Sequence, residues 1–284
     1  MARISFGGRF AIFVCAALWS TSGLCIKLVD AHPFIIAGMR SLIAAATMIA
    51  ARAAFMRKPL RGIGDAIKTP AFWAAAVAYS ATMITFVVAN KLTASANVIL
   101  LQYSAPVWAA LLGIPLIKEK PRAENWACLT FVLCGLVVIF YGALASGSLA
   151  GDTIALASGV LFALNSVCMR MQKNADPAYS MIFSHFITAV FAVPFFFTSA
   201  PLFTVPTAAA VFFMGTVQMG FASILFAYGI KRVKAAVAMI IACIEPVLNP
   251  LWVFVVTGEK PALNVIVGGA IIVLAVTFSA VRSR

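Results

Sequence analysis

The feature that most limits how this chain can fold is a series of ten long apolar runs. A helix needs about 20 mostly apolar residues to cross the roughly 30 Å hydrocarbon core of a bilayer, and each run is close to that length. The runs cover residues 10–29, 33–55, 71–90, 93–116, 124–145, 152–172, 178–199, 207–230, 234–256 and 261–281. The sequence lacks the alternation of polar and apolar residues that is typical of membrane barrel strands. It therefore predicts an all-α integral membrane protein with ten transmembrane helices.

Composition excludes the main soluble classes. The chain is 63% apolar and 10% charged, whereas soluble domains are about 45–50% apolar and about 25% charged. A soluble fold of this composition would expose large apolar patches and aggregate. We therefore expect neither a soluble enzyme nor a nucleic-acid partner, despite the formal net charge of +13.

The basic residues predict the orientation of the ten helices. If the N-terminus is cytoplasmic, 17 of the 21 Lys and Arg residues fall on the cytoplasmic side, and Arg40 falls within a span. The remaining three, Lys27, Lys91 and Lys260, fall on the opposite side. This asymmetry is the positive-inside pattern, so we expect a bacterial inner membrane protein with both termini cytoplasmic. The excess of positive charge then serves to contact anionic lipid.

The chain contains an internal repeat. Shifted by 140 residues, positions 72–121 align without a gap on positions 212–261, with 12 identities that include Glu119-Lys120-Pro121 on Glu259-Lys260-Pro261. We therefore divide the chain into two five-helix repeats, residues 1–147 and 148–284. Because five is odd, the second repeat enters the membrane from the opposite side. Two homologous halves of inverted topology are the architecture of secondary transporters.

Several short motifs resemble the drug/metabolite transporter superfamily, in its ten-helix branch with duplicated EamA-type domains. They are Ala17-Leu18-Trp19-Ser20, Lys27, Ala37-Gly38-Met39-Arg40, and the pairs Pro106 with Glu119 and Pro246 with Glu259. The resemblance implies a substrate cavity between helices 1–4 and 6–9, with helices 5 and 10 structural. It also implies small organic substrates that are often exported. The sequence departs from the family pattern at Cys128, where a glycine is expected.

Glu245 is the main candidate for coupling transport to protons. It lies at the centre of the ninth run, and it is the one acidic residue placed that deep. A carboxylate at this depth costs about 2.5–3.5 kcal/mol on insertion scales, and such residues usually face a cavity or a partner. The alternative is a structural pair with Arg40, His185 or a backbone group.

Arg40 and His185 are the next candidates. Arg40 can bind a substrate carboxylate through two parallel hydrogen bonds, or its long side chain can extend to the headgroups outside. His185 can relay protons, or it can be a hydrogen-bonded core residue.

Neutral polar and aromatic residues from both repeats fall at mid-membrane depth, where inverted repeats form a shared binding site. The substrate-binding candidates are Trp19, Tyr79, Gln102, Tyr103, Asn165, Gln218 and Glu245. The alternative for each neutral residue is hydrogen bonding between helices. Three prolines, Pro106, Pro246 and Pro250, are predicted to kink the helices that gate the cavity.

No sequence signal for catalysis is present. There is no Walker A, HExxH or GxSxG motif, so direct ATP use and hydrolysis are unsupported. The six cysteines form no metal-binding or disulfide pattern, and we expect no metal or cofactor. The sequence thus favours a secondary transporter, not an enzyme, which exports amino acids or related compounds by alternating access. The alternatives are an importer of a vitamin or nucleoside, or a non-transporting intramembrane enzyme or scaffold. The oligomeric state stays open.

Overall fold

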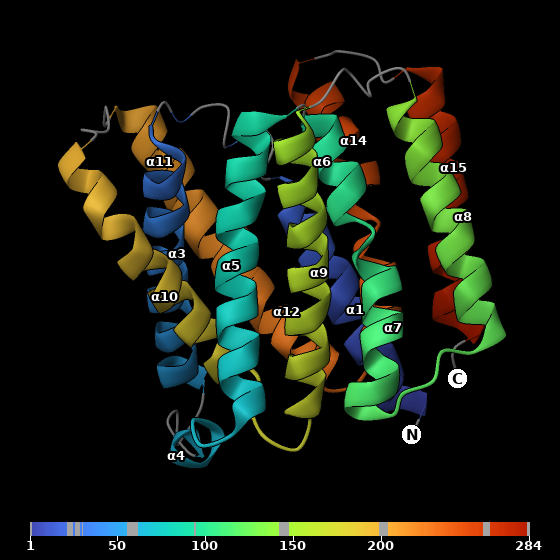
Figure 1. The fold of residues 1–284 in the computed structure, drawn as a ribbon, viewed down its shortest axis with the longest axis horizontal. Coiled ribbons are helices and arrows are strands. Elements are labelled where there is room, and N and C mark those ends of the chain that lie inside the picture. Colours follow the sequence, from blue (N-terminus) through green and yellow to red (C-terminus); the bar gives the residue numbers. More distant parts are fainter. Residues whose placement is uncertain are drawn as a thin grey trace.

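In the computed structural model, every regular element in the described part of the chain is a helix (Figure 1). The described residues are 2–21, 25, 29, 31–55, 62–93, 95–141, 148–198, 204–257 and 262–282. The helices are α1 (Ala2–Trp19), α3 (Pro33–Phe55), α4 (Ile63–Ala66), α5 (Pro70–Leu92), α6 (Ser95–Gln102), α7 (Ala105–Ile117), α8 (Ala123–Phe140), α9 (Leu149–Met171), α10 (Ala178–Thr198), α11 (Val205–Phe213), the π-helix η1 (Met214–Phe221), α12 (Ala222–Ile230), α13 (Ala235–Ala242), α14 (Glu245–Thr257) and α15 (Leu263–Arg282).

These helices confirm the prediction of an all-α multi-pass membrane protein. Within the described residues, seven helical segments are long and apolar enough to cross a membrane. Three shorter apolar helices, Gly7–Trp19, Ala235–Leu248 and Leu263–Ser279, lie at the first, ninth and tenth predicted spans. The described part leaves out residues 22–24, 26–28 and 258–261, and with them Lys27, Glu259 and Lys260. α1 begins and α15 ends at the same end of the bundle (Figure 1).

The internal repeat is visible in the helix boundaries. α6 and α13 cover residues 95–102 and 235–242, and α7 and α14 cover residues 105–117 and 245–257, so each pair is offset by the 140 residues of the sequence repeat. Both predicted membrane helices are therefore broken at equivalent places, residues 103–104 and 243–244. Pro106 and Pro246 lie at the second residue of α7 and α14. A proline there leaves the carbonyl four residues earlier without its usual partner, which accounts for both breaks.

The second repeat departs from the first in its third helix. Residues 214–221 form the π-helix η1, whereas the equivalent residues 74–81 belong to the regular helix α5. Two glycines of η1 let α3 approach closely: a Cβ at Gly215 would lie 2.5 Å from Cβ of Ile43, and one at Gly220 would lie 2.9 Å from Cβ of Thr47. Single π-helical turns occur frequently at functional sites.

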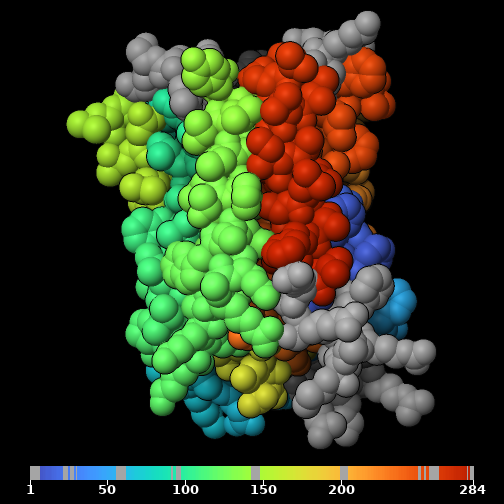
Figure 2. Space-filling model, turned by 90° about the vertical axis from the view of Figure 1, so that its right-hand side faces the viewer, coloured from blue at the N-terminus to red at the C-terminus, as the bar shows by residue number. Residues whose placement is uncertain are grey.

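α8 and α15 pack side by side along one flank of the bundle (Figure 2). Their closest approach is at two glycines: a Cβ added to Gly135 would lie 2.8 Å from the carbonyl oxygen of Gly268, and one added to Gly268 would lie 2.5 Å from that of Gly135. Small residues at a helix crossing allow such backbone contact within a membrane. This pair corresponds to helices 5 and 10 of the sequence.

Gly268→Val is expected to destabilise the protein, because the added side chain would meet backbone atoms that cannot move away. Overpacking of this kind costs about 1–3 kcal/mol, which a thermal melt of the purified protein in detergent would detect. Gly64→Val in α4 is the control, since a Cβ there meets nothing within 4 Å. Equal melting temperatures for both variants would contradict a close α8–α15 contact.

Candidate functional site

A cavity lies between the helices, and its empty space of about 520 Å³ includes part of the open solvent. Its twelve lining residues come from both repeats and from α1, α3, α5, the α6–α7 break, α9, η1 and α14. They are Trp19, Arg40, Tyr79, Thr82, Met83, Phe86, Gln102, Tyr103, Phe162, Gln218, Met219 and Glu245. Small-molecule sites typically combine apolar walls with a few polar groups, as this lining does. α8 and α15 contribute none of these residues.

Seven of the residues singled out in the sequence line this cavity: Trp19, Arg40, Tyr79, Gln102, Tyr103, Gln218 and Glu245. The sequence interpretation missed Thr82, Met83 and Phe86, which follow Tyr79 on the same face of α5 at helical spacing. That spacing could have identified them once Tyr79 was chosen. Phe162 and Met219 carried no comparable signal, because apolar residues are common throughout the chain.

Opposite charges meet the cavity from two different helices. Arg40 of α3 is only 4% exposed, and its Nε has no hydrogen-bond partner. Glu245 begins α14, and its carboxyl group lies within hydrogen-bonding reach of the Tyr103 hydroxyl. No ion pair joins Arg40 to Glu245 among the described residues. Both side chains are therefore available to a molecule in the cavity.

The apolar wall of the cavity is aromatic. Trp19 packs against Phe162 and Phe226, with ring centroids 5.6 and 5.3 Å apart. The ring centroids of Tyr79 and Phe162 lie 6.4 Å apart. Three polar atoms of lining residues are buried without a hydrogen-bond partner: Nε1 of Trp19, Nε of Arg40 and Oε1 of Gln218. Buried polar atoms in native proteins are normally paired, so these atoms indicate a site completed by a ligand or water.

A hydrogen-bond chain fixes the amide of Gln102 at the α6–α7 break. Its Nε2 donates to Oγ of Ser158 over 3.3 Å, and that hydroxyl donates to the carbonyl oxygen of Thr82 over 3.3 Å. α9 therefore holds the break against α5.

Three of the other singled-out residues lie elsewhere. Asn165 of α9 is 1% exposed, and neither polar atom of its amide has a partner, but it does not line the cavity. His185 of α10 is fully buried behind Tyr79, with Nε2 3.1 Å from Oγ of Ser223. Pro250 belongs to α14, and its side chain lies outside the described part of the structure. The gating role of the three prolines stays a prediction.

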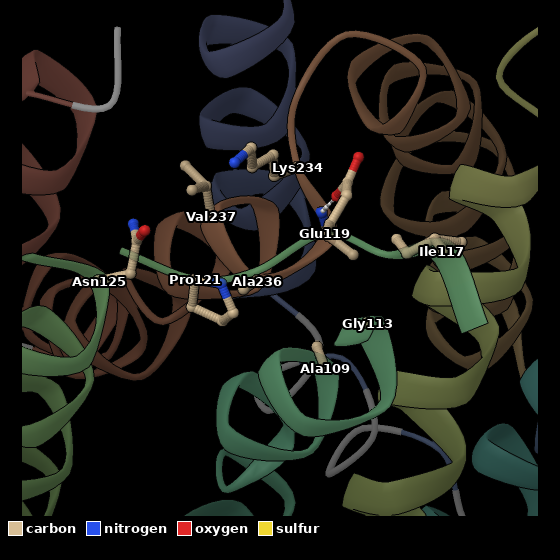
Figure 3. Close-up of a pocket in the computed structure, with 10 residues that line it drawn as sticks. Ala109, Gly113, Ile117, Glu119, Pro121, Asn125, Lys234, Ala236 and Val237 are labelled. Carbon is tan, nitrogen blue, oxygen red and sulfur yellow. Dashed lines mark hydrogen bonds between the residues drawn. The ribbon is translucent and has the colours of Figure 1, made fainter. Parts of the chain in front are cut away.

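A second polar cluster lies at the end of the bundle where α7 and α9 end and α13 begins. Glu119 of the Glu-Lys-Pro motif pairs with Arg170, with Nε and Oε1 2.8 Å apart. Arg170 also donates to the carbonyl oxygens of Ile230 and Lys231. The other oxygen of Glu119 accepts a hydrogen bond from the backbone N–H of Ala235 over 3.4 Å, the dashed line in Figure 3. This cluster, which we call the Glu119 clasp, ties the first repeat to the second.

Glu119→Gln is expected to loosen this end of the bundle, because the amide cannot hold Arg170 by charge. Hydrogen exchange of the amides in the first turn of α13 should then accelerate, on the order of tenfold for the loss of about 1.4 kcal/mol. Asp176→Asn is the matched control, since it weakens the Arg52–Asp176 pair, which is 2.7 Å long and lies at another helix end. Unchanged exchange in Glu119→Gln would show that the clasp does not hold the two repeats together.

Comparison with known proteins places the chain among transporters. The EamA-like transporter family matches residues 7–141 and again residues 149–281. An uncharacterized transporter of Archaeoglobus fulgidus is 27% identical over 197 residues, 69% of this chain and 70% of that protein. The uncharacterized transporter YwfM of Bacillus subtilis is 25% identical over 277 residues, 94% of this chain and 92% of that protein. A solved crystal structure with 22% identity has the same fold, with a TM-score of 0.80 over 98% of both chains.

Proposed function

Because this chain belongs to the EamA-like transporter family, we propose that it exports amino acids with large apolar side chains by alternating access. The membrane in this proposal is a bacterial inner membrane, with both chain termini in the cytoplasm. The proposal rests most heavily on one observation: Arg40 and Glu245 line the same cavity without pairing with each other.

A zwitterionic amino acid complements these two charges. The guanidinium of Arg40 can bind a carboxylate through two parallel hydrogen bonds. The carboxylate of Glu245 can accept hydrogen bonds from an ammonium group. Trp19 and Phe162, with Met219, provide an apolar surface for a side chain. A substrate that satisfies both charges also lowers the cost of burying them in the membrane.

The position of the cavity fits an outward-facing conformation. Arg40 lies seven residues from the start of α3, and the lining face of α5 runs from Tyr79 toward its C-terminal end. By the basic-residue asymmetry, both of those helix ends are on the outer side. The Glu119 clasp closes the cytoplasmic side. Inward opening then requires the repeats to rock about the breaks before Pro106 and Pro246, as inverted repeats allow.

Glu245 supplies the coupling to protons in this proposal. Its carboxylate lies at the start of a half-helix, beside Tyr103 and at mid-membrane depth. Protonation removes the charge that binds the substrate ammonium, so proton uptake from outside would release an exported amino acid. The same carboxyl would lose the proton when it faces the cytoplasm.

Uptake into proteoliposomes tests this function. The panel is labelled L-phenylalanine, L-leucine, L-lysine, uridine and thiamine, each measured with and without a pH gradient. We expect flux of phenylalanine and leucine that responds to the gradient. Flux of uridine or thiamine in place of the amino acids would instead favour an importer of nucleosides or vitamins. No flux of any compound through folded protein would reject the proposal.

A further inference from the structure

Three buried polar side chains form a hydrogen-bonded chain behind the cavity wall. Tyr79 of α5 lines the cavity, and its hydroxyl lies within hydrogen-bonding reach of the Ser223 side chain of α12. Ser223 lies 3.1 Å from Nε2 of His185 on α10. The Tyr79 and His185 rings meet edge to face, with centroids 5.8 Å apart at 84°. Ser223 and His185 are fully buried, so their protons are ordered by the protein and not by bulk water.

The chain of hydrogen bonds can be ordered in two directions. A tyrosine hydroxyl, a serine hydroxyl and a neutral imidazole each carry one exchangeable proton. We take the ring of His185 as neutral, because it is fully buried and the charged group that acts on it is the guanidinium of Arg40. The direction of the chain then decides whether Tyr79 presents a proton or a lone pair to the cavity.

In the first direction, Nε2–H of His185 donates to Ser223, and Ser223 donates to Tyr79. The Tyr79 proton then points into the cavity, and Nδ1 of His185 carries an unused lone pair. In the second direction, Tyr79 donates to Ser223, and Ser223 donates to Nε2 of His185. Nδ1 then carries a proton, and the cavity meets the lone pairs of Tyr79.

The surroundings of Nδ1 favour the first direction. Nδ1 is buried and has no hydrogen-bond partner. Buried N–H groups without a partner are rarer in native proteins than acceptors without one. The positive charge of Arg40 acts on the His185 ring, and it stabilises a lone pair on Nδ1 while it opposes a proton there. Both arguments place the ring proton on Nε2.

We infer that Ser223 and His185 are positioning residues, which direct the hydroxyl proton of Tyr79 into the cavity to bind the substrate carboxylate together with Arg40. Tyr79 and Arg40 both line the cavity. A hydroxyl donor beside a guanidinium forms an anion-binding pair, and a hydroxyl that presented its lone pairs would not. This inference rests on the proposed amino-acid substrate.

Nitrogen NMR of the whole chain in detergent micelles tests the proton direction without any substrate. The chain has two histidines, His32 and His185. His32→Gln therefore leaves one ring, labelled with ¹⁵N. We expect Nε2 to carry the proton and Nδ1 to resonate as an unprotonated nitrogen. A proton on Nδ1, or on both nitrogens, would overturn the inference. A paramagnetic reagent assigns the rings in the unsubstituted chain, because His185 is fully buried.

Transport kinetics test the consequence for the substrate. Tyr79→Phe and Ser223→Ala should each raise KM for L-phenylalanine about tenfold, because each weakens a hydrogen bond to a charged group. The double variant should be no worse than either single variant, since both act through one hydroxyl. Ser166→Ala is the control. Ser166 is equally buried and outside the cavity, and its hydroxyl contacts the carbonyl oxygen of Phe162 in its own helix and Sδ of Met239 in α13.

The outcomes separate the inference from the proposed function. Additive effects in the double variant, or an equal effect of Ser166→Ala, would contradict a positioning role for Ser223. Absence of phenylalanine uptake by the unsubstituted protein would reject the amino-acid substrate, and the carboxylate role of Tyr79 with it. The NMR spectrum would still decide the direction of the hydrogen bonds in that case.

Discussion

Glu245→Gln is expected to abolish accumulation driven by a pH gradient while leaving exchange of substrate across the membrane. Gln keeps the shape of the side chain but cannot release or take up a proton. The ratio of substrate concentration inside the vesicles to that outside should therefore fall to about 1. Exchange of labelled for unlabelled L-phenylalanine at saturating concentration should continue, because it requires only that the loaded carrier changes conformation. Both quantities can be measured on the same proteoliposomes.

Glu124→Gln is the matched control for this substitution. Glu124 lies in the first turn of α8 and does not line the cavity. Its substitution should leave both accumulation and exchange unchanged. Accumulation that survives in Glu245→Gln would show that another group couples transport to protons. Loss of both activities in folded protein would assign Glu245 to binding alone.

Arg40→Gln is expected to raise KM for L-phenylalanine by at least about 30-fold. Truncating one partner of a buried charged pair costs about 2–5 kcal/mol, and 1.4 kcal/mol corresponds to tenfold. Arg40→Lys keeps the charge but lacks the planar guanidinium group that binds a carboxylate through two hydrogen bonds. We therefore expect an intermediate increase in KM. Uptake over a range of substrate concentrations gives both values.

The amide of phenylalanine separates a carboxylate contact from a general loss of structure. L-Phenylalaninamide lacks the carboxylate, so its inhibition constant against the labelled substrate should be nearly the same in Arg40→Gln and in the unsubstituted protein. Arg122→Gln, at the residue before the start of α8, should change neither the KM of the acid nor the inhibition constant of the amide. An equal loss of affinity for the acid and the amide would show that Arg40 does not bind the carboxylate.

The architecture could be predicted from the sequence because membrane constraints act on every residue. The apolar runs indicate the spans, the basic loops indicate their orientation, and the repeat indicates the two halves. The helix breaks before Pro106 and Pro246 follow from the chemistry of proline. The π-helix η1 was not predicted. Its glycines Gly215 and Gly220 pack closely against α3, and such contacts between helices leave no local signal in the sequence.

The candidate site was predicted in part, for a related reason. Mid-membrane depth is readable from sequence, and Arg40, Gln102 and Glu245 do line one cavity. The direction in which a side chain points is set by packing against other helices, so Asn165 has the right depth but lies outside the cavity. Ser223 carried no sequence signal, because a serine within a membrane helix is common. Its role becomes visible only beside His185.

A crystal structure with 4-bromo-L-phenylalanine bound would locate the substrate, because bromine gives an anomalous signal. We expect one bromine site in the cavity between the repeats, with the ligand carboxylate at Arg40 and Tyr79 and its ammonium at Glu245. Bromine bound only outside this cavity, or a ligand in the cavity that contacts neither Arg40 nor Glu245, would show that this cavity does not bind amino acids as proposed.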